Sequence, residues 1–227
     1  MISKTKSFCF LSLLAMLLLA IGQVSAADTL RGTGDLGIVI ERTSGAVTIV
    51  ETTNRTVLGR VEGLGDLSHA SAVYSRDQRY AYIFGRDGGL SKIDILTATL
   101  VNRVIQAGNA IGGAISDDGR LIAVSNYEPG GVRVFDADSL EPIAEIPATY
   151  GAAGLRSKTV GLVDAPGRRF LFSLYDAGEI WMIDCARCLD GGQMAVTQIG
   201  TAGELPYDGL ITEMWSSYTH GLFGEAG

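Results

Sequence analysis

The feature that most constrains the fold is an apolar strand pattern that ends in an acidic residue and occurs four times. The acidic residues are Glu51, Asp94, Asp136 and Asp184, at intervals of 43, 42 and 48 residues. The first three are followed by another strand-like run, over Thr56–Val61, Thr99–Ile105 and Pro142–Ile146. A turn and then a strand precede the last three, with the turns at 75–80, 116–121 and 164–169. β-Branched and aromatic residues dominate these runs, and helical periodicity is almost absent between them.

A period of about 40–50 residues with about four strands per unit is typical of a β-propeller. One four-stranded unit cannot bury both of its faces, so the units have to stack around a channel. The sequence therefore predicts an all-β propeller. We expect each acidic residue to accept hydrogen bonds from the turn that follows it.

The chain contains 30 Gly in 227 residues, which is well above the average usage of about 7%. We expect the excess to lie in tight turns, such as those at Gly88-Gly89, Gly112-Gly113, Gly130-Gly131 and Gly191-Gly192. Gly32-Thr33-Gly34-Asp35-Leu36-Gly37 fits the dinucleotide-binding pattern G-x-G-x-x-G. That loop must follow a strand and begin a helix, and here it precedes a strand instead, so we interpret it as a lead-in to the first unit.

The first 26 residues have the pattern of a cleaved secretory signal. Lys4 and Lys6 precede the apolar run Phe8–Ile21, and Val24 and Ala26 fit the small-residue positions of a cleavage site. The alternative is a membrane anchor, but the run is shorter than the roughly 20 residues that a span needs. We therefore expect an exported protein that leaves the membrane after cleavage. The net charge of −7 argues against a nucleic-acid partner.

Residues 27–227 hold about four and a half units of this period. An incomplete ring leaves unpaired strand edges, so we expect these residues to be part of a larger ring. A small closed propeller with irregular blades is the alternative.

A few residues are candidates for chemistry. Cys185 and Cys188 form a C-x-x-C pair without the His that covalent haem attachment needs, so a local disulfide or a redox-active pair is expected. His69 precedes the strand that begins a unit, where it is either a turn residue or a haem-iron ligand. Arg86 lies in a predicted hairpin, where it either remains solvated or binds a carboxylate.

Several of these segments resemble a known family. The run from His69 to Asp94, with Gly85-Arg86-Asp87-Gly88 within it, resembles the haem d1 domain of cytochrome cd1 nitrite reductase. Within this superfamily the rest resembles the NirF-like d1-haem biosynthesis proteins, through the segments 126–131, 156–158, 160–170 and 176–181. The reductase and its relative NirN carry a cytochrome c domain, and the absence of C-x-x-C-H favours the NirF branch.

The resemblance implies an eight-bladed propeller, of which residues 27–227 form roughly the first half. It implies a d1-type haem or haem precursor in the channel, with His69 as the axial ligand of the iron. Arg86 and Arg156 would bind carboxylates, Tyr127 would line the pocket, and Asp164 would act as a catalytic proton carrier.

The implied function is a late step of d1-haem biosynthesis in the periplasm. An enzyme such as a dehydrogenase and a carrier that delivers the haem to nitrite reductase both remain open. Cytochrome cd1 nitrite reductase and other d1-haem biosynthesis proteins are the implied protein partners. From a different class, the alternative is a non-catalytic propeller scaffold in which His69 and Arg86 are merely structural.

Overall fold

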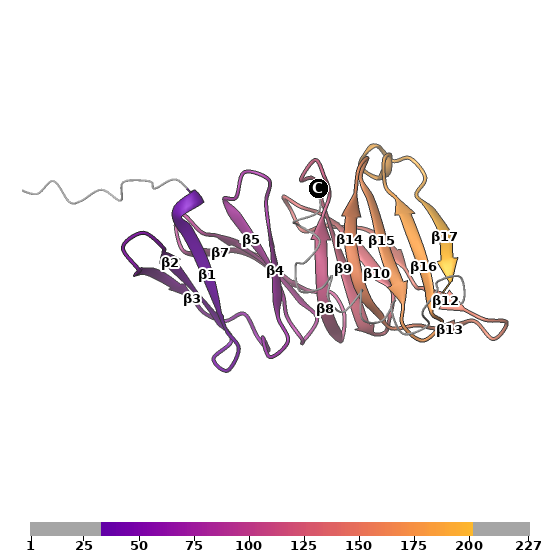
Figure 1. The fold of residues 1–227 in the computed structure, drawn as a ribbon, viewed down its shortest axis with the longest axis horizontal. Coiled ribbons are helices and arrows are strands. Elements are labelled where there is room, and N and C mark those ends of the chain that lie inside the picture. Colours follow the sequence, from indigo (N-terminus) through magenta and orange to yellow (C-terminus); the bar gives the residue numbers. More distant parts are fainter. Residues whose placement is uncertain (1–32, 202–227) are drawn as a thin grey trace, which may run out of the picture. The chain divides into compact units, whose positions relative to one another are not determined.

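The computed structural model describes residues 33–201, whose regular secondary structure is almost entirely β-strand (Figure 1). The predicted signal peptide and the residues after Thr201 lie outside this range. A short 3-10 helix, η1 (Thr33–Asp35), precedes the first strand, and a second, η2 (Cys188–Asp190), lies between the last two. None of the helices in the described range is long and apolar enough to cross a membrane.

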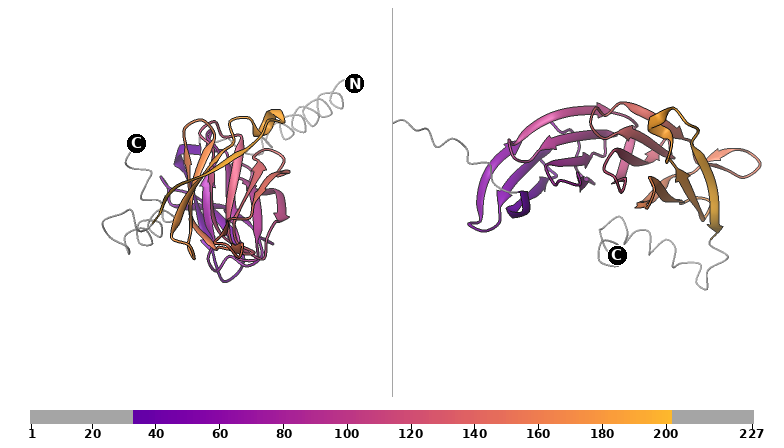
Figure 2. Two further views of the ribbon diagram at one scale, coloured as in Figure 1. Left: turned by 90° about the vertical axis from the view of Figure 1, so that its right-hand side faces the viewer. Right: turned by 90° about the horizontal axis from the view of Figure 1, so that it is seen from above.

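The strands form four antiparallel sheets in chain order, which can be followed by colour in Figure 2. Sheet 1 contains β1 (Leu36–Glu41), β2 (Ala46–Glu51) and β3 (Thr56–Val61). Sheet 2 contains β4 (Ser71–Tyr74), β5 (Tyr80–Phe84), β6 (Gly89–Asp94) and β7 (Thr99–Ile105). Sheet 3 contains β8 (Asn109–Ile115), β9 (Leu121–Glu128), β10 (Val132–Asp136) and β11 (Pro142–Ile146). Sheet 4 contains β14 (Thr159–Ala165), β15 (Arg169–Leu174), β16 (Glu179–Asp184) and β17 (Ala195–Thr201). The hairpin of β12 (Thr149–Tyr150) and β13 (Leu155–Arg156) lies between sheets 3 and 4 in the sequence.

The predicted acidic turns are confirmed in all four sheets. Glu51 accepts the backbone N–H groups of Thr53 and Asn54 at 2.6 and 2.7 Å. Asp136 binds two backbone N–H groups of its turn in the same way, at 2.8 and 2.9 Å. Asp94 and Asp184 each accept the N–H two residues later, at 3.0 Å. The repeated acid is therefore a structural element that closes the turn after its strand.

Sheet 1 has three strands within residues 33–201, and sheets 2, 3 and 4 have the expected four. The interval of 48 residues before Asp184 contains the hairpin β12–β13, which the strand pattern does not predict. The strand β17 is also absent from the prediction, because its residues are mostly exposed and lack the apolar pattern of a buried strand.

The core consists of three apolar clusters, each between two neighbouring sheets. The cluster between sheets 2 and 3 shows how close the packing is, since the Phe84 ring occupies the space where a Cβ on Gly113 would lie. Gly112 and Gly113 are inside β8, so the prediction that this pair forms a turn is wrong. Glycine is needed here because a neighbouring sheet packs directly on the strand backbone.

The strand order gives the sheets two distinct ends. In sheets 2, 3 and 4 the first strand begins beside the end of the second, with Ser71 opposite Phe84, Asn109 opposite Glu128 and Thr159 opposite Leu174. We call this the His69 end, because His69 lies just before β4. The other end holds the turns between first and second strands, and we call it the Arg76 end.

Candidate functional site

His69 and Arg86 are brought together at the His69 end of sheet 2, on two adjacent backbone segments. His69 lies in a turn closed by the bond from the Ala70 N–H to the Leu67 carbonyl, at 3.1 Å. Arg86 follows β5, and its backbone N–H donates to the Asp66 carbonyl at 2.8 Å. The main chain therefore holds the hairpin of Arg86 against the loop of His69.

The loop that carries His69 is also held by the side chains of Arg103 and Asp87. The guanidinium of Arg103 donates to the Leu64 carbonyl at 3.1 Å and to Asp87 Oδ2 at 2.6 Å. Gly65 has a φ of +77° and lies directly against these two side chains, where a Cβ would collide with both. Only glycine fits this position, so the loop that carries His69 has a fixed path.

The side chains of His69 and Arg86 are both exposed. Within residues 33–201 neither makes a hydrogen bond or an ion pair through its side chain. Asp66 lies beside them, and its pKa is lowered by its hydrogen bonds from Ser68 and, to a smaller extent, by electrostatic interaction with Arg86 and His69. The arrangement therefore offers an imidazole and a guanidinium to a ligand, next to a carboxylate whose pKa is lowered by hydrogen bonds from Ser68.

Tyr127 also lies at the His69 end, on the second strand of sheet 3. The pairing of β8 with β9 skips Tyr127, since Asn109 faces Glu128 and Ala110 faces Asn126. Tyr127 is thus the extra residue of a β-bulge, a feature that redirects a side chain and is common near binding sites. Its side chain is half-buried.

A buried polar network fixes the strand on which Tyr127 lies. The amides of Asn126 and Gln106 bond to each other at 2.8 and 3.3 Å. Thr159 Oγ1 accepts the Asn126 N–H at 3.0 Å, and this links sheet 3 to the start of sheet 4. All three side chains are buried, so loss of any one would leave a polar partner unsatisfied.

The structure does not place Arg156 beside His69 and Arg86. Arg156 is on the hairpin strand β13, and its guanidinium lies 3.4 Å from Glu145 on β11, the outermost strand of sheet 3. Arg133 binds the same carboxylate at 3.0 Å. Arg156 is therefore already engaged, and it lies toward the outer edge of the sheets.

Asp164 lies at the Arg76 end, opposite the end that holds His69. Its carboxylate is paired with the guanidinium of Arg76 at 2.9 Å. Arg76 also donates to the carbonyls of Ile115 and Ser116, so one side chain of sheet 2 contacts sheets 3 and 4. The position of Asp164 thus gives no support to the predicted catalytic role, which remains a prediction.

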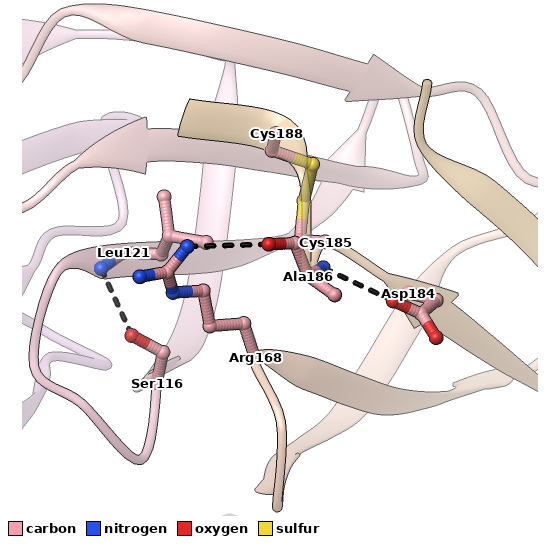
Figure 3. The surroundings of a disulfide bond; sticks show 7 residues. All are labelled: Ser116, Leu121, Arg168, Asp184, Cys185, Ala186 and Cys188. Carbon is pink, nitrogen blue, oxygen red and sulfur yellow. Dashed lines mark hydrogen bonds between the residues drawn. A yellow bond between two sulfur atoms is a disulfide. The ribbon is translucent and has the colours of Figure 1, made fainter. Parts of the chain in front are cut away.

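The rest of the Arg76 end is also held by paired groups. Asp117 accepts the backbone N–H groups of Gly167 and Arg168, and these bonds lower its pKa. Arg168 donates through its side chain to Asp118 at 2.6 Å. It also donates to the Ala186 carbonyl at 3.2 Å (Figure 3).

Cys185 and Cys188, whose bonding the sequence left open, form a local disulfide in the turn that contains Ala186 (Figure 3). Cys185 is buried in the core between sheets 3 and 4, and Cys188 packs against that core. The pair thus joins the β16–β17 turn to the core. In the described part of the chain, no group of three or more His, Cys, Asp and Glu residues is arranged to hold a metal ion.

Asp66 and the clamp residue Arg103 are the parts of the site that the sequence reasoning missed. The sequence contains one usable signal, since an Asp followed two residues later by Ser68 is typical of a turn in which the carboxylate binds the backbone. No local pattern places Arg103, because its partners are 16 and 39 residues away.

Four antiparallel sheets in series are the arrangement of an all-β protein of the propeller type. The chain belongs to the cytochrome D1 heme domain family, whose model matches residues 31–226.

Within this family the chain is similar to Protein NirF. It is 55% identical over 215 residues to Protein NirF of Stutzerimonas stutzeri, which covers 93% of this chain and 54% of the relative. It is 57% identical over 213 residues to Protein NirF of Pseudomonas aeruginosa, with the same shares covered. The chain thus spans about half the length of these relatives.

The fold is also similar to a solved structure, that of dihydro-heme d1 dehydrogenase NirN in complex with DHE. The TM-score is 0.67 at 29% sequence identity, and the match covers 75% of this chain and 36% of NirN.

Proposed function

We propose that this chain binds a d1-type tetrapyrrole at the His69 end, as part of a NirF-like protein of d1-haem biosynthesis. One observation carries the proposal. His69 and Arg86 are held together by the main chain around Asp66, and both side chains are left without a partner among the described residues. The identity to two NirF proteins and the likeness to a NirN structure that contains DHE support the same ligand class.

The available groups fit such a ligand. A ring nitrogen of His69 is a suitable axial ligand for haem iron, and the bound haem then supplies the redox and spectroscopic properties. The guanidinium of Arg86 presents several N–H donors in a plane, which suits a peripheral carboxylate of the macrocycle. Tyr127, redirected by the bulge in β9, adds an aromatic surface at the same end. Together these side chains bind and orient the ligand.

We further propose that the four sheets form about half of an eight-bladed ring, with the ligand in its channel. The share of the relatives that the chain covers, 54%, supports this count. The protein partners proposed are cytochrome cd1 nitrite reductase, as recipient of the haem, and other d1-haem biosynthesis proteins.

Export to the periplasm is proposed from residues 1–26 alone. Lys4, Lys6 and the apolar run Phe8–Ile21, followed by Val24 and Ala26, form the pattern of a cleaved signal. N-terminal sequencing of the secreted protein should give Ala27, and an intact Met1 in the periplasmic fraction would contradict cleavage.

A titration with a d1-type haem, followed by absorbance, tests the binding proposal. We expect Arg86→Gln to weaken binding about tenfold, as for loss of one charge-assisted hydrogen bond. The matched control is Arg55→Gln, because Arg55 is an exposed arginine in the β2–β3 turn, away from His69. If the wild type and Arg86→Gln bind the haem with equal affinity, Arg86 does not contact the ligand, and a non-catalytic scaffold is the better explanation of this end.

A further inference from the structure

Resting on the proposed function, we propose that Lys158 is the cation with which sheet 4 binds a peripheral carboxylate of the tetrapyrrole. The sequence resemblance assigns this role of binding a carboxylate to Arg156, two residues earlier in the chain. The inference depends on where the two side chains lie and on what each already contacts.

Lys158 is placed at the His69 end by its position in the strand order. It comes directly before Thr159, the first residue of β14, which is the first strand of sheet 4. His69 comes two residues before Ser71, the first residue of β4, which is the first strand of sheet 2. Both strands pack against β8, the first strand of the sheet between them. The two residues therefore lie at matching places on either side of sheet 3.

The backbone of Lys158 is fixed on both sides. Its N–H donates to Asp176 Oδ2 at 2.9 Å, and its carbonyl accepts the Tyr175 N–H at 2.9 Å. Ser157 Oγ donates to the same carbonyl and accepts the Asp176 N–H at 3.0 Å. These bonds hold the residue against the hairpin between β15 and β16, in the way that Arg86 is held against Asp66.

The ammonium group, in contrast, is loosely held. Lys158 Nζ lies 3.9 Å from Asp176 Oδ1, beyond normal hydrogen-bond length, and the side chain is half-exposed. The Tyr175 ring centre is 5.9 Å away, near the limit of a cation–π contact. Lys92 shows the opposite case, since its ammonium is buried and bonded to Asp138 at 2.9 Å. The backbone of Lys158 is therefore fixed, while its ammonium group can turn toward an incoming carboxylate.

Arg156 lacks this freedom. Its guanidinium is engaged with Glu145 on the outermost strand of sheet 3, a carboxylate that it shares with Arg133. Lys158 directly precedes the first strand of its sheet, at the end of the sheets where His69 and Arg86 also lie. A ligand held by His69 can reach the start of β14 across a single intervening sheet.

The experiment compares Lys158→Gln with Arg156→Gln in absorbance titrations with a d1-type haem and with the same haem as its methyl ester. Lys158→Gln should weaken binding of the free acid about tenfold and reduce its salt dependence, while leaving the spectrum of the complex unchanged. It should leave binding of the ester unchanged, and Arg156→Gln should behave as wild type with both ligands. Thermal unfolding of the two variants should match wild type, because the contacts of Lys158 that fix the loop are made by its backbone.

The outcomes separate this inference from the proposed function. If the wild type binds the haem and Arg86→Gln weakens it, but Lys158→Gln equals wild type, the assignment of Lys158 is wrong and the proposed function stands. If Arg156→Gln alone weakens binding, the sequence-based assignment was correct. If the wild type binds neither form, both the proposed function and the role of Lys158 are overturned.

Discussion

The two ends of the sheets use the same residue types in different ways. At the Arg76 end the charged side chains bind groups of neighbouring sheets, as Arg76 does with Ser116 and Asp164 and as Arg168 does with Asp118. At the His69 end the main chain and the Asp87–Arg103 pair connect the segments, and the side chains of His69 and Arg86 make no hydrogen bond or ion pair within the described range. Charge alone therefore does not identify a ligand site in this chain.

The difference has a physical reason. A propeller-type stack needs contacts between sheets, and interdigitated arginines and aspartates provide them at the Arg76 end. A group that is saturated in this way gains little from binding a ligand, since an existing bond has to be broken first. At the His69 end the Asp87–Arg103 pair and the backbone bonds do the structural work, which leaves the outer side chains available.

The largest effect that would test this comparison is expected from Arg76→Ala. The substitution removes hydrogen bonds to two carbonyls of sheet 3 and the pair with Asp164. We expect the free energy of unfolding to fall by about 2–3 kcal/mol, because several hydrogen bonds to a charged group are lost. Urea unfolding measures the change, and Arg42→Ala, at an exposed arginine of the β1–β2 turn, is the control. A variant as stable as wild type would show that the Arg76 end is not held by this side chain.

A smaller effect is expected from Asp164→Asn, which removes only the ion pair at the same place. Both partners are almost half-exposed, so the loss should be about 0.5 kcal/mol or less. Binding of a d1-type haem should not change. If the variant keeps its stability but fails to convert a bound tetrapyrrole that the wild type converts, Asp164 is catalytic despite its position, and the division between the two ends breaks down.

The sequence predicted those parts of the fold that depend on local chemistry. The acidic turns recur with a fixed spacing, because each carboxylate binds backbone groups only two or three residues away. The sequence also predicted the strands next to these turns, and the bounds of Thr56–Val61 and Thr99–Ile105 are those that the structure shows. The hairpin β12–β13 and the exposed strand β17 have no such signal.

The candidate site was predicted only in part, for a similar reason. The resemblance identified His69, Arg86 and Tyr127, and the structure places all three at one end. It also assigned roles to Arg156 and Asp164, whose partners lie 11 and 88 residues away in the sequence. Whether a charged side chain is saturated depends on such distant partners, and neither spacing nor composition reveals them. Gly113 illustrates the same limit, since its requirement for glycine comes in part from the Phe84 ring of another sheet.

The most direct test of the account is a d1-type haem titration of the wild type and His69→Ala, followed by the absorbance of the bound iron. The account predicts that the variant loses the spectrum of an imidazole-ligated haem. Loss of an outer-shell partner costs a metal site about 10–100-fold in affinity. Because His69 is proposed to bind the iron directly, the affinity of His69→Ala for the haem should fall by more than this. Added imidazole should restore the spectrum, and stability should equal that of the wild type, because the His69 side chain is exposed. If His69→Ala keeps the wild-type spectrum and affinity, the His69 end does not ligate the haem iron and the central claim is wrong.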